Sequence, residues 1–343
     1  MWKKVEYTKR QINEAGRTII KPDILPQERE KALTIIDNWR AAHAFPMNTF
    51  AITLKKKTQS IPDAIVVQRL KRLNTITHKL VRFPKMELYR MQDLGGCRVI
   101  VPTIEDVYKV KTSLRESRIR HIEHNVKDYI ATPNPNTGYR GVHVIYRYKS
   151  ERSPDYNGLQ VEIQIRTKLQ HLWATAVETV GIFTQNGLKF NQGSDRWLHF
   201  FKVVSALFSV EEKSAIVDGI DTNPAIITHE LVSIIDELSV IEKLYTIGLA
   251  TSQIGKSSKS KKPGYYLLIL NIDKMELTVT RISGVERATE EYNAIESLRS
   301  DSNIDAVLVS ASSFEALTSA YPNYFADIKE FTVKLAELMK KYA

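Results

Sequence analysis

The chain has 343 residues, a net charge of +10 and 43% hydrophobic residues, which is enough to bury a sizeable core over two or three domains. Its single cysteine, Cys97, excludes a disulfide framework and a zinc site built from several thiolates. No apolar run approaches the roughly 18–20 residues that span a bilayer, and the basic N-terminus lacks the apolar stretch of a secretory signal, so we expect a cytoplasmic protein.

The charge is distributed unevenly along the chain. Residues 1–200 contain 34 Lys and Arg against 19 Asp and Glu, a net charge of +15, whereas residues 201–343 contain 15 against 20, a net charge of −5. A basic half joined to an acidic half predicts a polyanionic substrate for the first half, and it allows the second half to dock onto the first. Ordinary variation of surface charge is the alternative.

Helical and strand-like patterns alternate in the first half of the chain. Helices are predicted over residues 1–45, 60–82 (with a basic face and a break near Asn74 and Thr75), 103–117 and from 167 onward. Strands are predicted over residues 97–102, 121–130 (strand and turn), 142–148 and 159–167. Thr103 has the place of a helix N-cap, with Asp106 three residues later. The alternation predicts an α/β or α+β sheet domain over about residues 50–190.

The second half divides at a linker rich in Ser and Lys. Residues 195–250 have helical patterns, and the linker leads to two strands, a helix, a third strand and terminal helices. We therefore expect a basic sheet domain over residues 1–200, a helical connector over 201–254, a linker over 255–263 and a small ββαβα module over 264–343.

The segment VEIQIRT (161–167) alternates strictly between apolar and polar residues. Its apolar residues fall on one face of the strand, and Glu162, Gln164 and Arg166 fall on the other at steps of roughly 6.5–7 Å. An acid, an amide and a guanidinium in a row suit a functional face. A solvent-exposed strand has the same pattern, and this strand alone favours that alternative.

Asp93 stands just before a glycine pair, Gly95 and Gly96, and a buried strand. Mg²⁺ is commonly held by one or two carboxylates together with phosphate oxygens and water. Asp93 and Glu162 form such a pair if their strands adjoin. A turn aspartate and an unrelated glutamate are the alternative.

The segment QRLKRLNTITHKL (68–80) is strongly basic. Lysines and arginines in this segment, near a two-carboxylate metal site, are suited to the phosphates of a nucleoside triphosphate. The alternative is a solvated basic helix. The cations are Arg69, Lys71, Arg72 and Lys79.

These motifs follow one another in a fixed order across residues 60–180. In order they are Arg69-Leu-Lys71, Lys79, Asp93-Leu-Gly-Gly-Cys-Arg98, Asn136-Thr-Gly-Tyr139-Arg-Gly-Val-His143, Val161-Glu162-Ile-Gln164-Ile-Arg166-Thr167 and Trp173-Ala174. In order and spacing they resemble the synthetase domain of the RelA/SpoT alarmone synthetases. The resemblance implies an α+β fold, a nucleotidyltransferase-like mixed sheet flanked by helices. It also implies transfer of the β,γ-pyrophosphate of ATP to a ribose 3′-hydroxyl, with release of AMP.

The resemblance also implies residue roles on the donor side. Asp93 and Glu162 would bind Mg²⁺ and act as the catalytic carboxylates, with Glu162 placed to help deprotonate the attacking hydroxyl. Two arginines would sandwich the adenine of ATP, and two lysines would hold its phosphates. These ATP-binding residues are Arg69, Arg98, Lys71 and Lys79.

On the acceptor side, Tyr139 matches a loop tyrosine that stacks on the acceptor's base. His143, Gln164 and Arg166 match positions on the same face of the sheet. Stacking on an aromatic ring is worth about 1–3 kcal/mol per base, so this tyrosine can decide which acceptor is placed.

Two acceptors remain open on the sequence. The basic first half favours the 3′-terminal adenosine of tRNA, whose modification would block translation, and the alternative acceptor is GDP or GTP, which would give an alarmone. The chain lacks the His-Asp dipeptide of the hydrolase domain of long family members, and its first 50 residues are too few for that domain, so hydrolase activity is not expected.

The C-terminal segment contains Tyr321, Tyr324 and Phe325 in the pattern YPNYF. This pattern, the linker and the acidic module resemble CapRel-like fused toxin–antitoxin proteins, whose zinc-finger-like C-terminal domain lacks the metal. The resemblance implies that these rings cover the ATP site, and that a phage protein such as a capsid protein releases them in antiphage defence. Core packing of the three rings is the alternative. A third hypothesis is a non-catalytic RNA-binding regulator.

Overall fold

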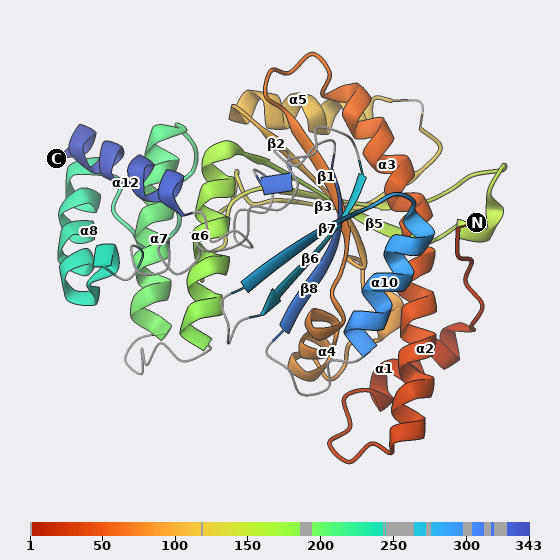
Figure 1. Cartoon of the computed structure of the whole chain (residues 1–343). Helices are drawn as coiled ribbons and strands as arrows, with labels where there is room; N and C mark the ends of the chain where they lie inside the picture. The colour runs from red at the N-terminus through yellow and green to blue at the C-terminus, as the bar shows by residue number, and fades with distance from the viewer. Residues whose placement is uncertain are drawn as a thin grey trace.

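An eight-stranded mixed sheet, in the order β3-β4-β5-β2-β1-β8-β6-β7, forms the centre of the protein (Figure 1). The computed structural model describes residues 2–117, 119–185, 194–242, 244, 264–271, 276–297, 304–311, 317–318 and 328–343. The strands are β1 (Ile65–Leu70), β2 (Gly95–Val101), β3 (Ile122–Asp128), β4 (Val142–Arg147), β5 (Gln160–Thr167), β6 (Gly264–Asn271), β7 (Glu276–Ile282) and β8 (Ile304–Ala311).

Helices cover both faces of this sheet. The helices of the described part of the chain are α1 (Lys9–Thr18), α2 (Pro26–Ala42), α3 (Ala44–Lys57), α4 (Leu73–Arg82), α5 (Ile104–Arg115), α6 (Lys168–Gln185), α7 (Ser194–Glu211), α8 (Pro224–Leu238), α10 (Val285–Ser297) and α12 (Lys329–Tyr342). Short 3₁₀ turns lie at Leu88–Arg90 and Pro154–Tyr156. The mixed α+β class expected from the sequence is confirmed.

One face of the first five strands packs against α2, α3 and α5. The apolar residues of β5 lie on this face, and Val161, Ile163 and Ile165 are fully buried there. The alternation in this strand is therefore a real division between a core face and a polar face. The polar face carries Glu162, Gln164 and Arg166, as the sequence predicts.

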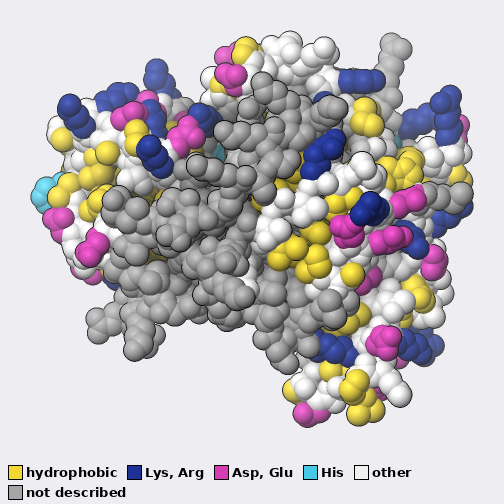
Figure 2. Space-filling model, in the orientation of Figure 1, with side chains coloured by type: hydrophobic (Ala, Val, Ile, Leu, Met, Phe, Trp, Pro, Cys, Tyr) yellow, Lys and Arg dark blue, Asp and Glu magenta, His cyan; other side chains and the backbone are white. Residues whose placement is uncertain are grey.

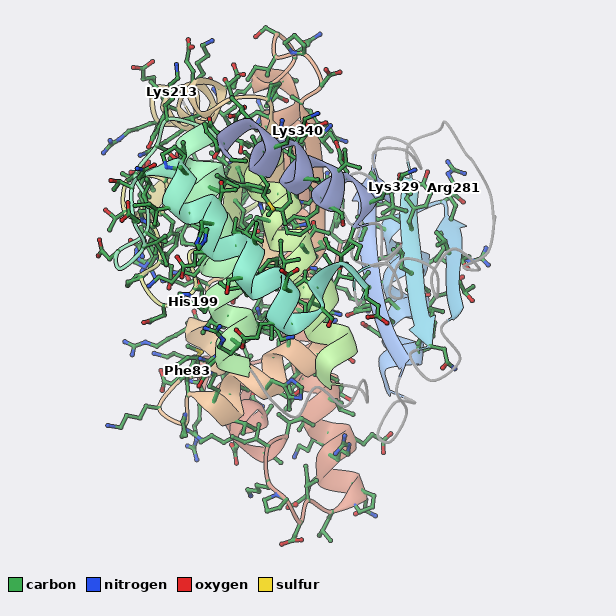
Figure 3. All side chains as sticks on the ribbon, turned by 90° about the vertical axis from the view of Figure 1, so that its left-hand side faces the viewer. Phe83, His199, Lys213, Arg281, Lys329 and Lys340 are labelled. Atoms are coloured by element: carbon green, nitrogen blue, oxygen red, sulfur yellow. The ribbon has the colours of Figure 1, made fainter. Side chains whose placement is uncertain are left out.

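A second helical layer consists of α6, α7, α8 and α12. Its core is aromatic and aliphatic, and the chain's last helix contributes Phe331, Leu335 and Leu338 to it. Figure 3 shows α12 lying alongside α7 and α8, so the end of the chain packs on the layer that follows β5. No described helix is long and apolar enough to cross a membrane.

The predicted helix over residues 60–82 is wrong in its first half. Residues 65–70 form β1, which pairs antiparallel with β2 from Ile65–Ile100 to Leu70–Gly95. Its β-branched start, Ile-Val-Val, fits a strand buried between two neighbours. The helix begins only at Leu73, after Arg72, so the break predicted near Asn74 and Thr75 is misplaced and Lys71 lies outside the helix.

Other local predictions are confirmed. The side chain of Thr103 accepts a hydrogen bond from the backbone N–H of Asp106 and so caps α5. The side chain of Thr167 accepts from the backbone N–H of Gln170 at the start of α6. The predicted strand–strand–helix–strand order after the linker also appears, as β6, β7, α10 and β8.

The C-terminal strands continue the central sheet. β8 pairs antiparallel with β1 through Gln68–Ser310 and Arg69–Val309, and β6 and β7 follow outward from β8. Helix α10 packs on these strands on the side of α2. The predicted boundary at residue 264 therefore does not divide the sheet into two.

Candidate functional site

Two lysines meet at Asp93 at one end of the sheet. The ammonium of Lys71 lies 2.8 Å from Oδ2 of Asp93, and that of Lys79 lies 3.0 Å from both oxygens. Lys71 follows the end of β1, whereas Lys79 extends from α4. All three side chains are between 15% and 28% exposed, so the cluster stays open to solvent.

This cluster fixes the charge of Asp93. Desolvation raises the pKa of the Asp93 carboxyl, but the positive charges of Lys71 and Lys79 outweigh it and lower the pKa below its ordinary value. Asp93 is thus ionised at neutral pH, and it holds two ammonium groups at one place. Such a pair of cations suits the oxygens of a polyphosphate.

A chain of hydrogen bonds runs across the polar face beside Asp93. The hydroxyl of Tyr139 lies 2.6 Å from Nε2 of His143, whose Nδ1 lies 2.9 Å from Oε1 of Glu162. The amide of Gln164 donates to Oε2 of Glu162 at 2.8 Å, and Arg166 donates to Oε1 of Gln164 at 2.9 Å. The structure therefore brings all four predicted acceptor-side residues together with the predicted catalytic carboxylate.

The ring of His143 is charged within this chain. Burial lowers its pKa, but the Tyr139 and Glu162 oxygens that face the ring raise it to about 9. Burial raises the pKa of Tyr139, yet the charges of His143 and Arg166 shift it below its ordinary value. Burial likewise raises the pKa of Glu162, but hydrogen bonding and the charge of His143 bring it below its ordinary value.

Asp93 and Glu162 lie near each other because their strands adjoin. β2 and β5 are parallel neighbours, with Gly95 beside Val161 and Gly96 beside Glu162, and Asp93 stands two residues before β2. The negative charge of Asp93 acts on Glu162 and raises its pKa, opposing the effect of His143. The two carboxylates fit the oxygen donors that Mg²⁺ prefers when phosphate and water complete its shell. No group of three or more His, Cys, Asp or Glu able to hold a metal occurs in the described part of the chain.

The predicted adenine-binding arginines lie on the same polar face. Arg69 of β1 stands opposite Gly96, and Arg98 of β2 stands beside Gln164. Both act on Glu178 of α6, together with Arg72 and Arg166. Desolvation raises the pKa of the Glu178 carboxyl, but these four positive charges outweigh it, and the pKa falls below its ordinary value.

The ring of Tyr139 is half-buried and packed on three sides. It makes edge contacts with Tyr129 at 5.6 Å and with His143 at 5.4 Å between ring centroids, and Trp173 of α6 lies 6.2 Å away. Its hydroxyl is within hydrogen-bond distance of Nε2 of His143. Stacking of this ring on an acceptor base stays a prediction.

Sequence reasoning missed several residues that shape this site. Glu178 had no signal beyond its place in a helix, and Arg140 and Glu212 form a buried ion pair at 2.7 Å that no pattern indicates. The signal for Arg140 was only its position next to Tyr139. The predicted autoinhibitory residues, Tyr321, Tyr324 and Phe325, lie outside the described residues.

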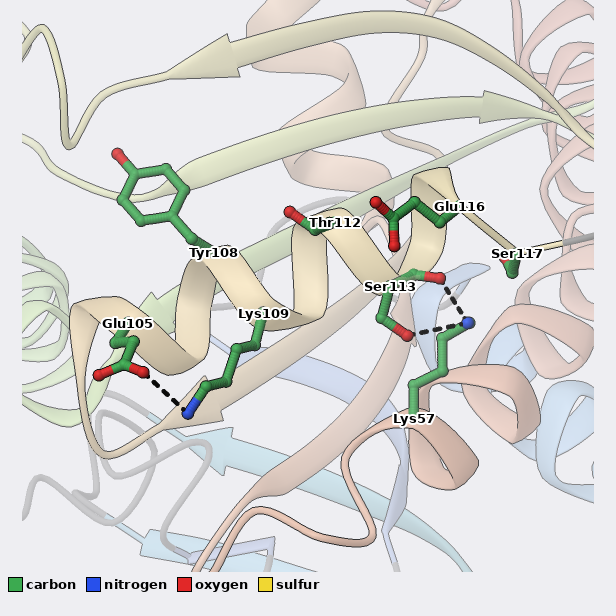
Figure 4. Close-up of a pocket in the computed structure, with 8 residues that line it drawn as sticks. All are labelled: Lys57, Glu105, Tyr108, Lys109, Thr112, Ser113, Glu116 and Ser117. Carbon is green, nitrogen blue, oxygen red and sulfur yellow. Dashed lines mark hydrogen bonds and ion pairs between the residues drawn. The ribbon is translucent and has the colours of Figure 1, made fainter.

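The depression in Figure 4 lies away from the candidate site residues. Residues of α5 line most of it, with Lys57 of α3, whose ammonium donates to the backbone oxygen of Ser113 at 2.5 Å and to its hydroxyl at 3.0 Å. None of the candidate site residues lines it. Lys57 joins α3 to α5 there and so is already engaged.

Comparison with known proteins gives matches to this part of the chain. Residues 68–185 match the family model described as a region found in RelA / SpoT proteins. GTP pyrophosphokinase YwaC of Bacillus subtilis (strain 168) is 35% identical over 112 residues, which are 31% of this chain and 52% of that one. GTP pyrophosphokinase YjbM of the same strain is 33% identical over 116 residues, which are 33% of this chain and 54% of that one.

The chain thus spans about half the length of the curated relatives it matches. Among solved structures, the small alarmone synthetase 1 from Bacillus subtilis aligns with a TM-score of 0.44 and 22% identity, over 52% of this chain and 92% of that one. The region matched by the family model contains every candidate ATP-, metal- and acceptor-binding residue described above. The connector and the C-terminal strands lie beyond it.

Proposed function

We propose that the chain is an ATP-dependent pyrophosphotransferase that moves the β,γ-pyrophosphate of ATP to the 3′-hydroxyl of a ribose. The observation that carries the proposal is the cluster of Lys71 and Lys79 on Asp93, beside Glu162 on the adjacent parallel strand. Transfer of a phosphoryl-type group depends on in-line placement and charge neutralisation more than on covalent chemistry. A pair of cations beside a pair of carboxylates supplies both signs of charge.

On the donor side, the triphosphate would exchange places with the Asp93 carboxylate on the two lysines. Lys71 and Lys79 would then bind phosphate oxygens, and Arg69 and Arg98 would hold the adenine from the neighbouring strands. Asp93 and Glu162 would hold Mg²⁺, which supplies neutralisation of the phosphate charge when bound. The positive charges of Arg69 and Arg98 also lower the pKa of Glu178, so an acidic group of α6 lies within electrostatic reach of both arginines.

On the acceptor side, Glu162 would act as the base that takes the proton of the attacking hydroxyl. His143 is positively charged at neutral pH and donates to Glu162, so it cannot itself serve as the base. It instead orients the Glu162 carboxylate and the Tyr139 hydroxyl. Gln164 fixes the second oxygen of Glu162, which leaves the carboxylate in one orientation.

Two acceptors are compatible with this site. The net charge of +15 on residues 1–200 supports the 3′-terminal adenosine of tRNA, because each phosphate contact of a long polyanion needs a cation. Identity to two proteins named GTP pyrophosphokinase supports GDP or GTP instead. On the described part of the face in Figure 2, Lys and Arg side chains alternate with acidic ones, so this face does not favour the longer polyanion.

The deciding experiment incubates the full chain with ATP labelled at the γ-phosphate, Mg²⁺ and bulk tRNA, GDP or GTP. Label on tRNA supports the tRNA acceptor, and label on GDP or GTP with none on tRNA overturns it. The full chain is needed because α12 fills the core of the α6–α8 layer and β8 covers β1. Because the C-terminal segment is proposed below to inhibit the donor site, the same assay is run on the full-length Tyr321→Ala/Tyr324→Ala variant. Absence of label on all three acceptors in both proteins refutes the transferase proposal.

A Glu162→Gln variant separates catalysis from mere binding. The substitution keeps the shape and the hydrogen bond to Gln164 but removes the charge that faces His143. We expect loss of transfer and of any toxicity to cells. Full toxicity of this variant would instead support the non-catalytic RNA-binding regulator.

We further propose that the C-terminal segment regulates the donor site and responds to a phage protein such as a capsid protein. Its support is that β8 pairs with β1 at Arg69, the predicted adenine-binding residue, and that the C-terminal half is acidic. A Tyr321→Ala/Tyr324→Ala variant should be more toxic than the natural chain. Equal toxicity of the variant and the natural chain would contradict the proposed autoinhibition. If phage infection leaves the toxicity of the natural chain unchanged, the proposed phage trigger is contradicted.

A further inference from the structure

Glu212 lies directly after α7, in the connector and outside the region that matches the family model. Its side chain is only 10% exposed, and both carboxylate oxygens accept hydrogen bonds. Oε2 accepts from Arg140 at 2.7 Å and from Gln170 at 3.1 Å, and Oε1 accepts from the hydroxyl of Thr167. One carboxylate therefore joins three segments that are far apart in the sequence.

The partners of Glu212 stand next to the acceptor-side residues. Arg140 directly follows Tyr139, and Thr167 directly follows Arg166 at the end of β5. Thr167 and Gln170 also cap each other, since each backbone N–H donates to the other's side chain. Glu212 thus holds the loop that carries Tyr139 and the strand end that carries Arg166 at one point.

Helix α7 holds the same loop at a second point. The hydroxyl of Ser205 donates to the backbone oxygen of Gly138 at 2.5 Å. Gly138 has a positive φ of 75°, and a Cβ there would lie 3.0 Å from Cβ of Ser205, so the loop lies close against the helix. Tyr139 is therefore placed between two anchors, Ser205 at Gly138 and Glu212 at Arg140.

The buried Arg140 guanidinium depends on the negative charge of Glu212. The Arg140 side chain is 2% exposed, and its Nη1 also donates to the hydroxyl of Ser214 at 2.9 Å. A guanidinium buried to this degree needs an anion, because an unpaired buried charge is strongly unfavourable.

We propose that Glu212 is the positioning residue of the acceptor side, where it fixes Tyr139 through Arg140 and Arg166 through Thr167. This inference rests on the proposed function for its catalytic meaning. Glu212 touches none of the reacting atoms. It hydrogen-bonds none of the donor-side residues, which come from β1, α4 and β2, so its loss should affect acceptor placement and spare ATP binding.

The test compares Glu212→Asp and Glu212→Gln with Glu211→Gln in the full chain. Glu211 is the matched control, because it precedes Glu212 but accepts from Lys341 and Tyr342 of α12 instead. Glu212→Asp keeps the charge and shortens the reach, so it should fold even if Glu212→Gln does not. We expect it to raise KM for the acceptor on the order of tenfold, with KM for ATP unchanged.

A second readout does not depend on transfer. Amide hydrogen exchange in Glu212→Asp should quicken in residues 134–141 and 164–170 and stay as in the natural chain in residues 71–82. Glu211→Gln should change neither KM nor exchange in these segments. An equal rise of both KM values, or unchanged exchange in residues 134–141, would overturn the positioning role.

The two readouts separate this inference from the proposed function. If neither the natural chain nor the Tyr321→Ala/Tyr324→Ala variant transfers pyrophosphate to any acceptor but exchange quickens as stated, the transferase proposal fails and Glu212 still positions the loop. If transfer is normal in Glu212→Asp, Glu212 is a structural residue of the connector only.

Discussion

The guanidinium of Arg40, in α2, lies over the ring of Tyr292, in α10, with 5.0 Å between its central carbon and the ring centroid. The Nε of the same arginine donates to the backbone oxygen of Lys71 at 3.1 Å. Both residues are at most 1% exposed. The C-terminal module therefore contacts, through one buried cation, the backbone of a lysine of the donor cluster.

Replacing Tyr292 should weaken the attachment of α10. A buried cation over a ring is worth about 2 kcal/mol or more, and removing a buried aromatic side chain costs about 3–5 kcal/mol. We expect Tyr292→Ala to lower the free energy of unfolding by that order, measured by urea denaturation. Tyr292→Phe keeps the ring and should stay within about 1 kcal/mol of the natural chain; an equal loss in both variants would show that the ring itself contributes little.

Asp93→Asn should abolish efficient transfer. The amide cannot neutralise Lys71 and Lys79 or supply a charged metal ligand, so we expect kcat/KM to fall on the order of 10²–10³-fold. Asp128→Asn is the matched control, because Asp128 also accepts from a lysine, Lys111, at 2.8 Å, and its side chain is similarly exposed. Transfer that falls equally in the two variants would argue against a special role for Asp93.

The His143–Glu162 pair should make stability depend on pH. The pKa of His143 in the folded chain is about 9, above its ordinary 6.5, so its stabilising effect is complete below pH 6.5 and is lost as the pH rises through about 9. One unit of such a shift corresponds to about 1.4 kcal/mol. We expect the natural chain to lose roughly 1–3 kcal/mol of unfolding free energy over this range relative to His143→Gln.

The measurement is chemical denaturation of both proteins at several pH values on either side of this window. His124→Gln, on the exposed side of β3, controls for the loss of an imidazole as such. A constant difference between the natural chain and His143→Gln at all pH values would contradict the charged state assigned to His143.

Gly138→Ala should destabilise the loop that carries Tyr139 by more than the backbone strain of a left-handed alanine alone. A left-handed residue other than glycine costs roughly 1–2 kcal/mol, and here the new Cβ would also press on Ser205 and Lys202 of α7. Gly158→Ala is the matched control, since Gly158 has a similar φ of 88° but no atom within 4 Å of a Cβ. We expect the larger loss of stability, and a raised KM for the acceptor, only in Gly138→Ala.

Much of the candidate site follows from the sequence because the chemistry lies in short local motifs. The alternation in VEIQIRT predicts correctly which side chains share a face with Glu162. The pairing of β2 with β5, which brings Asp93 near Glu162, had to be assumed. A strand's neighbours depend on contacts between distant segments, which local periodicity does not record.

The wrong helix prediction for residues 65–70 and the residues missed by the sequence also have a physical cause. The pattern with a basic face predicts a helix over residues 60–82, whereas residues 65–70 form a strand because β1 is paired between β2 and β8. The β-branched run Ile65-Val66-Val67 fits this strand. The roles of Glu212 and Glu178 cannot be predicted from local sequence for a related reason. Each meets its partners only when the helices after β5 pack against the site.

The order of the strands has a consequence for synthesis of the protein. β1 leaves the ribosome more than 200 residues before β8, its partner on one side. Until β8 arrives, the first five strands can pair among themselves, but β1 presents an open row of backbone donors and acceptors to any other nascent chain. Pairing of β8 with β1 thus has a role in folding, because it covers the edge of β1 that would otherwise favour aggregation.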